Sequence, residues 1–224
     1  MPLSLGLCLF FPPVAEPLSD TLEKMVLVPA GHFQMGSQQH GNDEKPVHTV
    51  HVSAFYIDKY EVTQKEFEQV MGENPSRFKG ADLPVDRATW FAAKAYCEKL
   101  NKRLPTEAEW EYAVKAGDDA GGFWFKGNSK KHTHPGGQKK PNALGIYDML
   151  GNLWEWVEDW YAEDYYKVSP LENPKGPPDG EYKVLRGGSW KLQASLVRPA
   201  NRLRGTPRNL NYNYGFRCVR EVSR

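Results

Sequence analysis

The chain has 224 residues, a formal net charge of +1 and charges of both signs spread along its length. This distribution excludes the broad basic or acidic field that nucleic acids and anionic membrane surfaces select, so no nucleic-acid partner is expected. Because no run approaches the ~18 consecutive apolar residues of a spanning helix, no membrane span is expected either.

The composition predicts one domain with many irregular connections. Twenty glycines, 17 prolines and 12% aromatic residues are typical of a loop-rich chain whose core is built on large rings. We interpret residues 25–220 as that domain and residues 1–24 as an N-terminal extension. The extension has a short apolar run without the basic start of a signal peptide. A truncated export signal and an apolar arm packed on the domain therefore both remain open.

The first elements are predicted to be strands. Residues 25–36 (MVLVPAGHFQMG) alternate apolar with small or polar residues around Pro-Ala-Gly, which predicts a hairpin. Residues 47–60 have the alternation of a strand.

Helices are predicted next. Thr63 with Glu66, and Thr106 with Glu109, match capping boxes, in which the threonine oxygen and the glutamate satisfy opposing backbone donors at a helix start. Between them, residues 89–101 carry apolar side chains at helical spacing. Three helices are therefore expected in this part of the chain.

Residues 118–143 are rich in glycine and lysine and have no period, so irregular surface structure is expected, broken by a short aromatic piece at residues 123–125. His132 and His134 occupy alternate positions in it. A histidine pair in a lysine-rich loop is more often solvated than bound to metal, so solvated side chains are expected.

The densest segment is residues 145–161 (GIYDMLGNLWEWVEDWY). Trp154, Trp156 and Trp160 at even spacing predict one buried strand face, with Glu155 on the opposite face. Asp148 precedes Glu155 across a glycine-containing bend that can turn carbonyls and both carboxylates to one point. Such oxygens suit calcium, although a turn with solvated acids fits the spacing better.

The last third contains two further strands and a basic cluster. Residues 183–190 (KVLRGGSW) predict a strand with a glycine pair where another backbone or a ligand comes close. Four arginines at residues 198–208 are interpreted as surface ion pairs with the acids of residues 155–164. Residues 215–220 (GFRCVR) are expected to form a core strand.

Three cysteines, Cys8, Cys97 and Cys218, are too few and too far apart for a zinc knuckle or a CxxC redox pair. A disulfide between Cys97 and Cys218 and a pair of buried thiols both fit the sequence.

The order and spacing of six phrases resemble the sulfatase-modifying-factor family, whose members carry the formylglycine-generating-enzyme type domain. The phrases are MVLVPAGHFQMGS, EVTQKEF, RLPTEAEWEYA, PNALGIYDMLGNLWEW, VLRGGSW and GFRCVR. The resemblance covers about residues 25–220. It implies a compact α+β domain of the bacterial single-domain type, related to the C-type lectin fold, with much irregular structure.

The resemblance also implies a structural calcium ion and a disulfide. The family's calcium ligands correspond to the side chains of Asp148 and Glu155 and to the residues between them, Met149, Gly151 and Leu153. A second family calcium site precedes this segment, but the corresponding loop is short here, so that site is not expected. The family's disulfide corresponds to Cys97 and Cys218.

The active site departs from the family pattern. Formylglycine-generating enzymes hold copper with two cysteines shortly after the GGS motif, because thiolates select Cu(I). No cysteine lies between Ser189 and Gly215. Copper and formylglycine generation by the known route are therefore not expected, and no catalytic residue is assigned.

A ligand cleft is the remaining candidate site. Trp154, Ser189 and Asn213 correspond to the lining of the family's peptide-binding cleft, and Trp190 adjoins them. A flat apolar wall beside polar groups is common in ligand sites, but Trp154 is as well explained as a core residue.

Two classes of function follow. The first is a calcium-stabilised binding module for a peptide or protein, supported by the adaptable Asn and Tyr side chains of residues 209–214 (NLNYNY). The second is an oxidoreductase with cysteine-independent chemistry, such as a maturation enzyme for a siderophore-type peptide, since relatives without the cysteines include a protein needed for maturing pyoverdine. An accessory subunit is a third.

The expected location is outside the cytoplasm, exported or periplasmic, with the cytoplasm as the alternative. The sequence specifies neither the ligand nor the oligomeric state.

Overall fold

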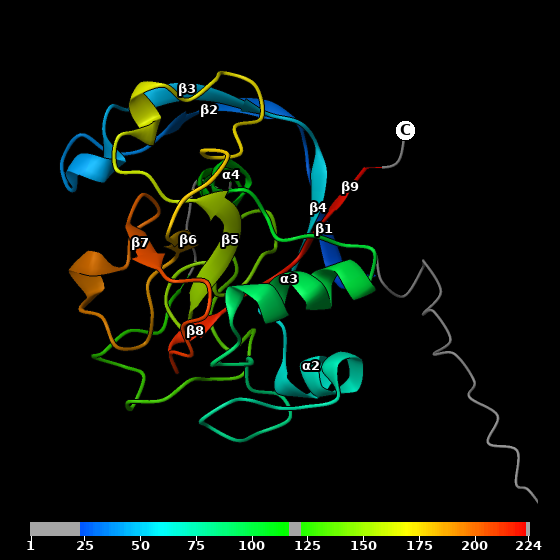
Figure 1. Cartoon of the computed structure of the whole chain (residues 1–224). Coiled ribbons are helices and arrows are strands. Elements are labelled where there is room, and N and C mark those ends of the chain that lie inside the picture. The colour runs from blue at the N-terminus through cyan, green and yellow to red at the C-terminus, as the bar shows by residue number, and fades with distance from the viewer. Residues whose placement is uncertain (1–22, 117–121, 223–224) are drawn as a thin grey trace, which may run out of the picture.

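Figure 1 shows the computed structural model, which describes residues 23–116 and 122–222. Within these residues the fold is α+β, as expected, with short helices and three small sheets. The helices are α2 (Gln64–Met71), α3 (Trp90–Lys99) and α4 (Glu107–Lys115), with 3-10 turns η1 (Asn42–Glu44), η2 (Tyr165–Lys167) and η3 (Ala194–Leu196). The strands are β1 (Met25–Val28), β2 (Gly31–Met35), β3 (His48–Val52), β4 (Phe55–Asp58), β5 (Trp154–Trp160), β6 (Lys183–Arg186), β7 (Arg202–Gly205), β8 (Tyr214–Gly215) and β9 (Val219–Glu221).

The largest sheet carries the tryptophan segment. Its strand order is β7-β6-β5-β8, with β5 and β8 parallel and the other pairs antiparallel. The other sheets are β1-β4-β9 and β2-β3. Figure 1 shows β5 near the centre of the molecule, and α3 and α4 both contact it.

The prediction of a hairpin within residues 25–36 is wrong. β1 pairs with β4 and β2 pairs with β3, in one continuous register in which Val28 opposes Phe55 and Gly31 opposes Val52. Residues 25–35 therefore run as one bent arm along residues 48–58. Pro29 lies at the bend, because it has no N–H to donate to the ladder. The chain reverses between β2 and β3 instead.

The three predicted helices are confirmed, and so are both capping boxes. Thr63 accepts the backbone N–H of Glu66, while the Glu66 carboxylate accepts that of Thr63. Thr106 and Glu109 repeat the arrangement at the start of α4. Such caps hold short helices that would be marginal alone.

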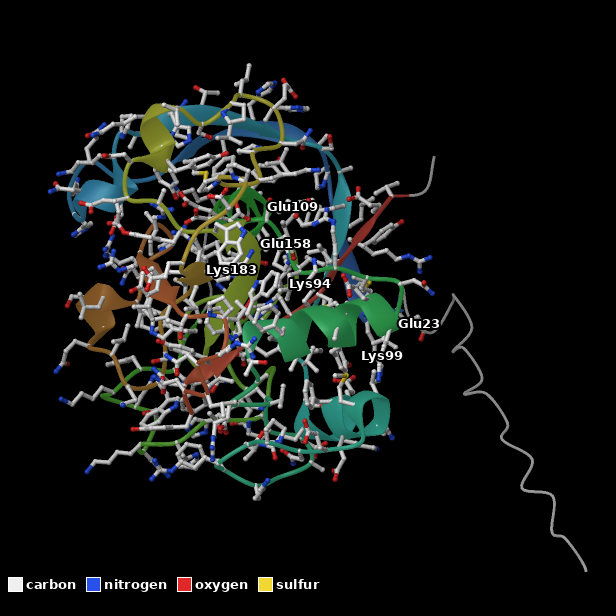
Figure 2. All side chains as sticks on the ribbon, viewed as in Figure 1. Glu23, Lys94, Lys99, Glu109, Glu158 and Lys183 are labelled. Carbon is white, nitrogen blue, oxygen red and sulfur yellow. A yellow bond between two sulfur atoms is a disulfide. The ribbon has the colours of Figure 1, made fainter. Side chains whose placement is uncertain are left out.

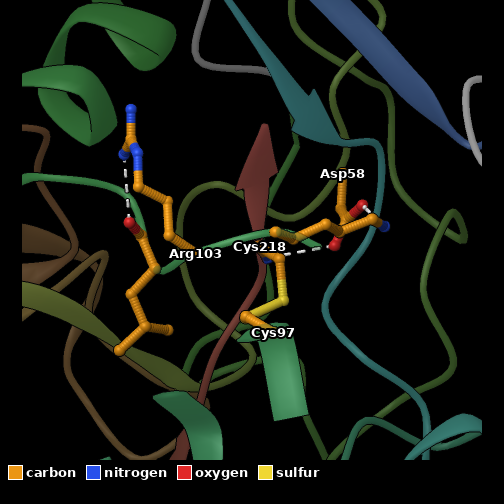
Figure 3. Close-up of a disulfide and its surroundings, with 6 residues drawn as sticks. Asp58, Cys97, Arg103 and Cys218 are labelled. Atoms are coloured by element: carbon orange, nitrogen blue, oxygen red, sulfur yellow. Dashed lines mark hydrogen bonds and ion pairs between the residues drawn. A yellow bond between two sulfur atoms is a disulfide. The ribbon is translucent and has the colours of Figure 1, made fainter. Parts of the chain in front are cut away.

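Two hydrophobic clusters meet at β5. Val157 belongs to the cluster that contains α4 residues, whereas Trp154 and Trp156 belong to the cluster that contains α3 residues and both bonded cysteines. The disulfide of Cys97 and Cys218 joins α3 to the segment before β9 over 121 residues of sequence, with the Cα atoms 5.8 Å apart (Figure 3). It ties the C-terminal strand to the second cluster.

No helix in residues 23–116 or 122–222 combines the length and the apolar character that crossing a bilayer requires. The proposed N-terminal extension lies almost wholly outside the described residues.

Candidate functional site

The tryptophan strand is buried on both faces. Trp154 and Trp156 are 4% and 0% exposed, and Glu155 between them is only 1% exposed. The pairing of β5 with β6 shifts register between Trp156 and Trp160. Trp160 is partly exposed and stacks on Trp90, a member of the same cluster as Trp154 and Trp156, with 6.3 Å between ring centroids.

Arg217 is the partner of Glu155, and the sequence analysis missed it. Its Nε and Nη2 donate to the Glu155 carboxylate at 2.7–3.0 Å, and the Trp110 indole donates to the same group at 2.9 Å. Arg217 also donates to the backbone carbonyls of Asp58, Lys59, Tyr147 and Asp148. The guanidinium is fully buried, so it holds the bend before β5, β4 and β8 together.

Two more carboxylates lie close to this ion pair. Glu61 accepts from the Asn152 amide at 2.6 Å and from the backbone N–H of Leu153 at 3.0 Å. Asp148, with φ of 53°, accepts the backbone N–H of Gly137 through Oδ2 at 2.8 Å. Its Oδ1 is buried and finds no hydrogen-bond partner among the described residues.

Burial dominates the electrostatics of this cluster. It raises the pKa of Glu61 well above its ordinary value, and the charges of Glu155 and Asp148 raise that pKa further. Burial also raises the pKa of Asp148, against the opposing effect of Arg217. The raised pKa values favour the protonated forms of Glu61 and Asp148, and only the Glu155 carboxylate bonds to the guanidinium. A cation bound here would favour the ionised carboxylates instead.

The residues expected to hold calcium all lie in the bend before β5 or at the start of that strand, where the Glu155 carboxylate already accepts from Arg217 and Trp110. Within the described residues no three His, Cys, Asp or Glu side chains gather closely enough to hold a metal on their own. Any cation here would therefore need backbone carbonyls as well, which is the mixed oxygen set that suits calcium. Met149, Gly151 and Leu153 are all buried between Asp148 and Glu155. The Asp148 Oδ1 atom has no hydrogen-bond partner among the described residues, so it is the carboxylate oxygen here that is free to bind a cation.

The expected cleft residues lie together but beneath the surface. Asn213 donates its side-chain amide to Ser189 Oγ at 3.1 Å, and its backbone carbonyl accepts from Trp154. All four, including Trp190, are at most 8% exposed. Ser189, Trp190 and Asn213 form a buried group, which we call the floor, and Trp154 is a core residue. Asn213 Oδ1 and Trp190 Nε1 are buried without a hydrogen-bond partner in the described part of the chain.

The expectation of solvated histidines is wrong for His134. Its ring stacks on Trp124 at 3.7 Å between centroids, and it is 8% exposed. Burial lowers its pKa, which favours the neutral ring. His132 lies beside it at 4.4 Å. Aromatic side chains on both sides of the loop, which local sequence cannot reveal, cover the pair.

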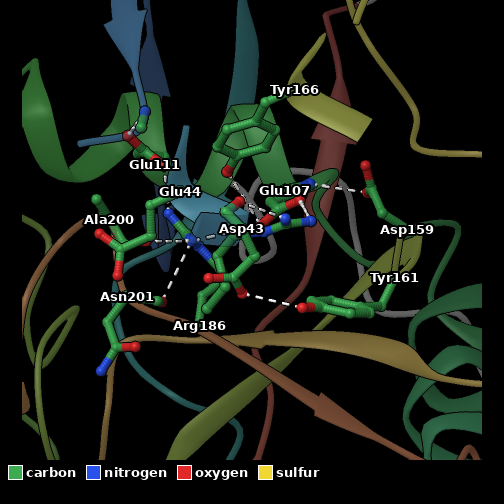
Figure 4. A network of polar contacts seen from close by, with 12 residues as sticks. Asp43, Glu44, Glu107, Glu111, Asp159, Tyr161, Tyr166, Arg186, Ala200 and Asn201 are labelled. Atoms are coloured by element: carbon green, nitrogen blue, oxygen red, sulfur yellow. Dashed lines mark hydrogen bonds and ion pairs between the residues drawn. The ribbon is translucent and has the colours of Figure 1, made fainter. Parts of the chain in front are cut away.

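The arginine cluster pairs with different acids than expected. Arg198 forms a two-point ion pair with Glu44, and Arg202 pairs with Glu107, so neither partner comes from residues 155–164. Glu107 also lies 3.3 Å from Arg186, which in turn pairs with Glu111. Figure 4 shows this buried network, which joins η1, α4, β6 and β7. It fixes the strand that leads into Gly187, Gly188 and Ser189.

A surface pocket of about 440 Å³ lies between α3, α4 and the end of β5. Its charged groups pair largely with one another, as Lys94 with Glu158 at 2.6 Å and Arg103 with Glu109 at 2.6 Å. Figure 2 shows Lys94, Glu109 and Glu158 near Lys183. The Lys183 ammonium lies 3.7–3.9 Å from the centroids of Trp160 and Trp90, and burial lowers its pKa to about 8.

Asp159 is expected to make stability depend on pH. Burial, and then Glu107, raise its pKa well above the ordinary value. Between pH ~4 and that raised pKa the folded protein holds a proton that the unfolded chain has released, so stability falls as the pH rises. Asp159→Asn, which keeps an acceptor for the Glu107 N–H, is expected to flatten this slope and stabilise by on the order of 1 kcal/mol at neutral pH. Urea unfolding of both proteins at several pH values measures it, with Asp179→Asn as an exposed control. An equal slope in the two proteins would contradict the assignment.

Comparison with known proteins agrees with this geometry. A family model described as "Sulfatase-modifying factor enzyme 1-like domain" (FGE-sulfatase) matches residues 12–222. The chain is 34% identical to "Serine/threonine-protein kinase pkn1" of Chlamydia pneumoniae over 90% of its own length, but it spans only 38% of that relative. It is 30% identical to the formylglycine-generating enzyme of Bos taurus, covering 88% of this chain and 74% of the relative.

Solved structures show the same fold. "Treponema denticola variable protein 1" superposes with a TM-score of 0.81 and 30% identity, covering 87% of this chain and 94% of the other. "PvdO from Pseudomonas aeruginosa" superposes with a TM-score of 0.79 and 28% identity, covering 88% of this chain and 94% of the other. The match over nearly the whole domain, together with the motif order and the paired cysteines, shows that the chain belongs to the formylglycine-generating-enzyme (sulfatase-modifying factor) family.

Proposed function

We propose that this chain is a calcium-stabilised family domain that does not generate formylglycine and that binds a peptide or protein ligand above the floor formed by Ser189, Trp190 and Asn213. One observation carries the proposal: no cysteine lies between Ser189 and Gly215, so the soft thiolate pair that selects Cu(I) has no source there. The fold and the buried floor remain.

Calcium is the proposed structural cofactor. Asp148 and Glu155 would supply carboxylate oxygens, and Met149, Gly151 and Leu153 would supply carbonyls. A bound cation would favour the ionised carboxylates beside Arg217 and fix the bend before β5. The buried, unpartnered Oδ1 of Asp148 supports this assignment.

Calcium is expected to raise the melting temperature of the protein relative to the same sample in a chelator. A ligand that binds only the folded state raises the free energy of unfolding by about 2.7 kcal/mol when its concentration is a hundred times its dissociation constant. Asp148→Ala and Glu155→Ala should each abolish the increment, whereas Asp179→Ala, an exposed acid, should keep it. If calcium leaves the melting temperature of the unaltered protein unchanged, the assignment is wrong.

Ligand binding is supported by the groups around the floor. Tyr212 and Phe78 are partly exposed above buried Trp190, and rigid aromatic side chains bind protein surfaces with little loss of conformational entropy. The likeness to a protein titled as variable supports recognition over catalysis.

Selection from a displayed random-peptide library on the immobilised protein tests ligand binding. Enriched peptides are expected to bind the unaltered protein and to lose at least about tenfold in affinity on Tyr212→Ser, as for a central aromatic contact. Tyr182→Ser, at the partly exposed residue directly before β6, should change affinity less than twofold. No enrichment, or equal loss in both variants, would count against the proposed site.

An oxidoreductase with cysteine-independent chemistry, such as a maturation enzyme for a siderophore-type peptide, is the second candidate, favoured by the likeness to PvdO. Metal analysis separates the two. Stoichiometric copper or iron with oxygen uptake on a thiol substrate would replace the binding module, whereas calcium alone supports it. An exported or periplasmic location is proposed with either function, because the disulfide requires an oxidising compartment.

A further inference from the structure

A row of six rings includes Trp190 of the proposed floor and the buried His134, and its other members are partly exposed. Phe78 contacts Trp190 at 5.8 Å, Tyr212 at 6.4 Å and His132 at 6.4 Å between centroids. The row continues from His132 through His134 to Trp124. The rings come from the loop after α2, the loop of residues 122–147, the segment after β6 and the segment before β8. Figure 1 shows the loop after α2 and β8 at the lower end of the molecule.

Cations lie over the rings at both ends of this row. The Arg77 guanidinium is 4.5 Å and the Lys191 ammonium 4.6 Å from the centroid of Tyr212, and Lys191 donates to its hydroxyl at 2.8 Å. Lys139 is 3.8 Å from the centroid of Trp124. Arg77 and Lys191 are exposed. Their remaining N–H donors are therefore available to a partner.

The two long segments of this face contain no acidic residue. Residues 122–147 carry five lysines and residues 187–216 carry Lys191 and four arginines, with no Asp or Glu in either. They lie against each other, because Lys126 donates its N–H to Leu192 and Ser129 donates to Trp190. The positive charge beside the rings comes from Lys191 and the lysines of residues 122–147, because Arg198 and Arg202 pair with Glu44 and Glu107 elsewhere in the fold.

The acid nearest to Arg77 is already used internally. Asp86 accepts the backbone N–H groups of Arg77 and Phe78 at 2.8 and 3.3 Å and is itself 0% exposed. Two arginines of the second segment are also occupied, since Arg198 pairs with Glu44 and Arg202 with Glu107. Within residues 23–116 and 122–222 the side chains of Arg77 and Lys191 contact rings and a hydroxyl, and Lys139 contacts Trp124 and interacts electrostatically with Asp148.

We propose that this face binds an acidic protein segment, a stretch of polypeptide whose Asp and Glu side chains meet Arg77, Lys191 and the lysines of residues 122–147. The inference rests on the proposed ligand binding and names its chemical class. Guanidinium and ammonium groups bind carboxylates through charge-assisted hydrogen bonds. Charge complementarity of this kind also speeds association and rejects basic partners.

The covered rings argue against single-stranded nucleic acid. Binding of that kind uses free aromatic faces on which bases stack. Here cations cover faces of Tyr212, and Lys139 and His134 both lie close to Trp124. Side chains that need only the cations' outer N–H donors suit this arrangement better.

Fluorescence anisotropy with a labelled oligoglutamate peptide tests the inference on the whole chain. Oligoglutamate is expected to bind, and oligoglutamine is not. The double variant Arg77→Glu with Lys191→Glu should lower the affinity at least about tenfold, and added salt should weaken binding of the unaltered protein. The matched control, Lys167→Glu with Lys175→Glu, makes the same charge change at exposed sites away from the row and should change affinity less than twofold. Arg77→Gln with Lys191→Gln, a milder variant, should show an intermediate loss.

The outcomes separate this inference from the broader one. If library peptides bind in a Tyr212-dependent manner but carry no acidic preference, and oligoglutamate does not bind, the acidic class is wrong while ligand binding stands. Tighter binding of oligothymidylate than of oligoglutamate would overturn the inference in favour of nucleic acid. Equal losses in the row variant and its control would show only general charge attraction and would also overturn it. If neither library peptides nor oligoglutamate bind, both proposals fall.

Discussion

Reducing the disulfide between Cys97 and Cys218 is expected to lower the free energy of unfolding by about 4–5 kcal/mol. The bond closes a loop of 121 residues, and in the chain-entropy model a loop of this order restricts the unfolded chain by about that amount. It also holds β9, which pairs with β4, against α3. The free energy of unfolding of a typical domain is only about 5–15 kcal/mol, so the reduced protein should unfold at a much lower urea concentration.

The measurement is urea unfolding with and without reductant, both in a Cys8→Ser background that removes the third thiol. The double variant Cys97→Ala with Cys218→Ala should match the reduced protein and should not respond to reductant. Mass spectrometry should show a gain of two hydrogens on reduction. An unchanged unfolding midpoint after complete reduction would refute the expected contribution, and an unchanged mass would refute the bond and weaken the case for export.

Local signals in the sequence predicted the helices well. The capping boxes at Thr63 and Thr106 act within three residues, so their chemistry is visible in the sequence itself. The hairpin at residues 25–36 failed because strand pairing is decided between distant segments. Pro29 suggested a turn locally, but the register with residues 48–58 makes it a bend within one arm.

The site was predictable only through the resemblance, and incompletely. The motif order implied the roles of Asp148 and Glu155, and it implied the disulfide that the structure contains. Arg217 and Glu61 were missed, although both lie inside quoted motifs. Their partners are 62 and 91 residues away in sequence, and no spacing rule connects residues so far apart. The same holds for the ion pair of Glu107 with Arg202, because no local pattern in the sequence predicts that both side chains are buried.

The burial of Trp154 changes the interpretation of this residue from part of a cleft wall to part of the core. Its place in the family's cleft and its place in the core are compatible, because the strand is covered on both faces. The partly exposed rings near it come instead from loops with no period, where Phe78 and Tyr212 meet over Trp190. Irregular segments therefore carry the groups that we propose to contact a ligand, while β5 and its ion pair lie in the core beneath them.

Replacing Arg217 by methionine is expected to destabilise the protein by about 3–5 kcal/mol, the range for breaking one side of a buried ion pair. Glu155 would keep only the Trp110 indole, four backbone carbonyls would lose a donor, and Glu61 and Asp148 would lose the cation that opposes their charge. Unfolding is measured in chelator, so that metal binding does not contribute.

A double-mutant cycle assigns this loss to the ion pair. Adding Glu155→Gln to Arg217→Met removes the uncompensated charge and should recover part of the loss, as coupling energies of up to about 3 kcal/mol between contacting residues allow. Arg220→Met, three residues later on β9 and partly exposed, should cost less than about 0.5 kcal/mol. If Arg217→Met costs no more than Arg220→Met, the guanidinium does not hold the bend before β5. The carboxylates around it would then have to be stabilised chiefly by protonation or by the cation.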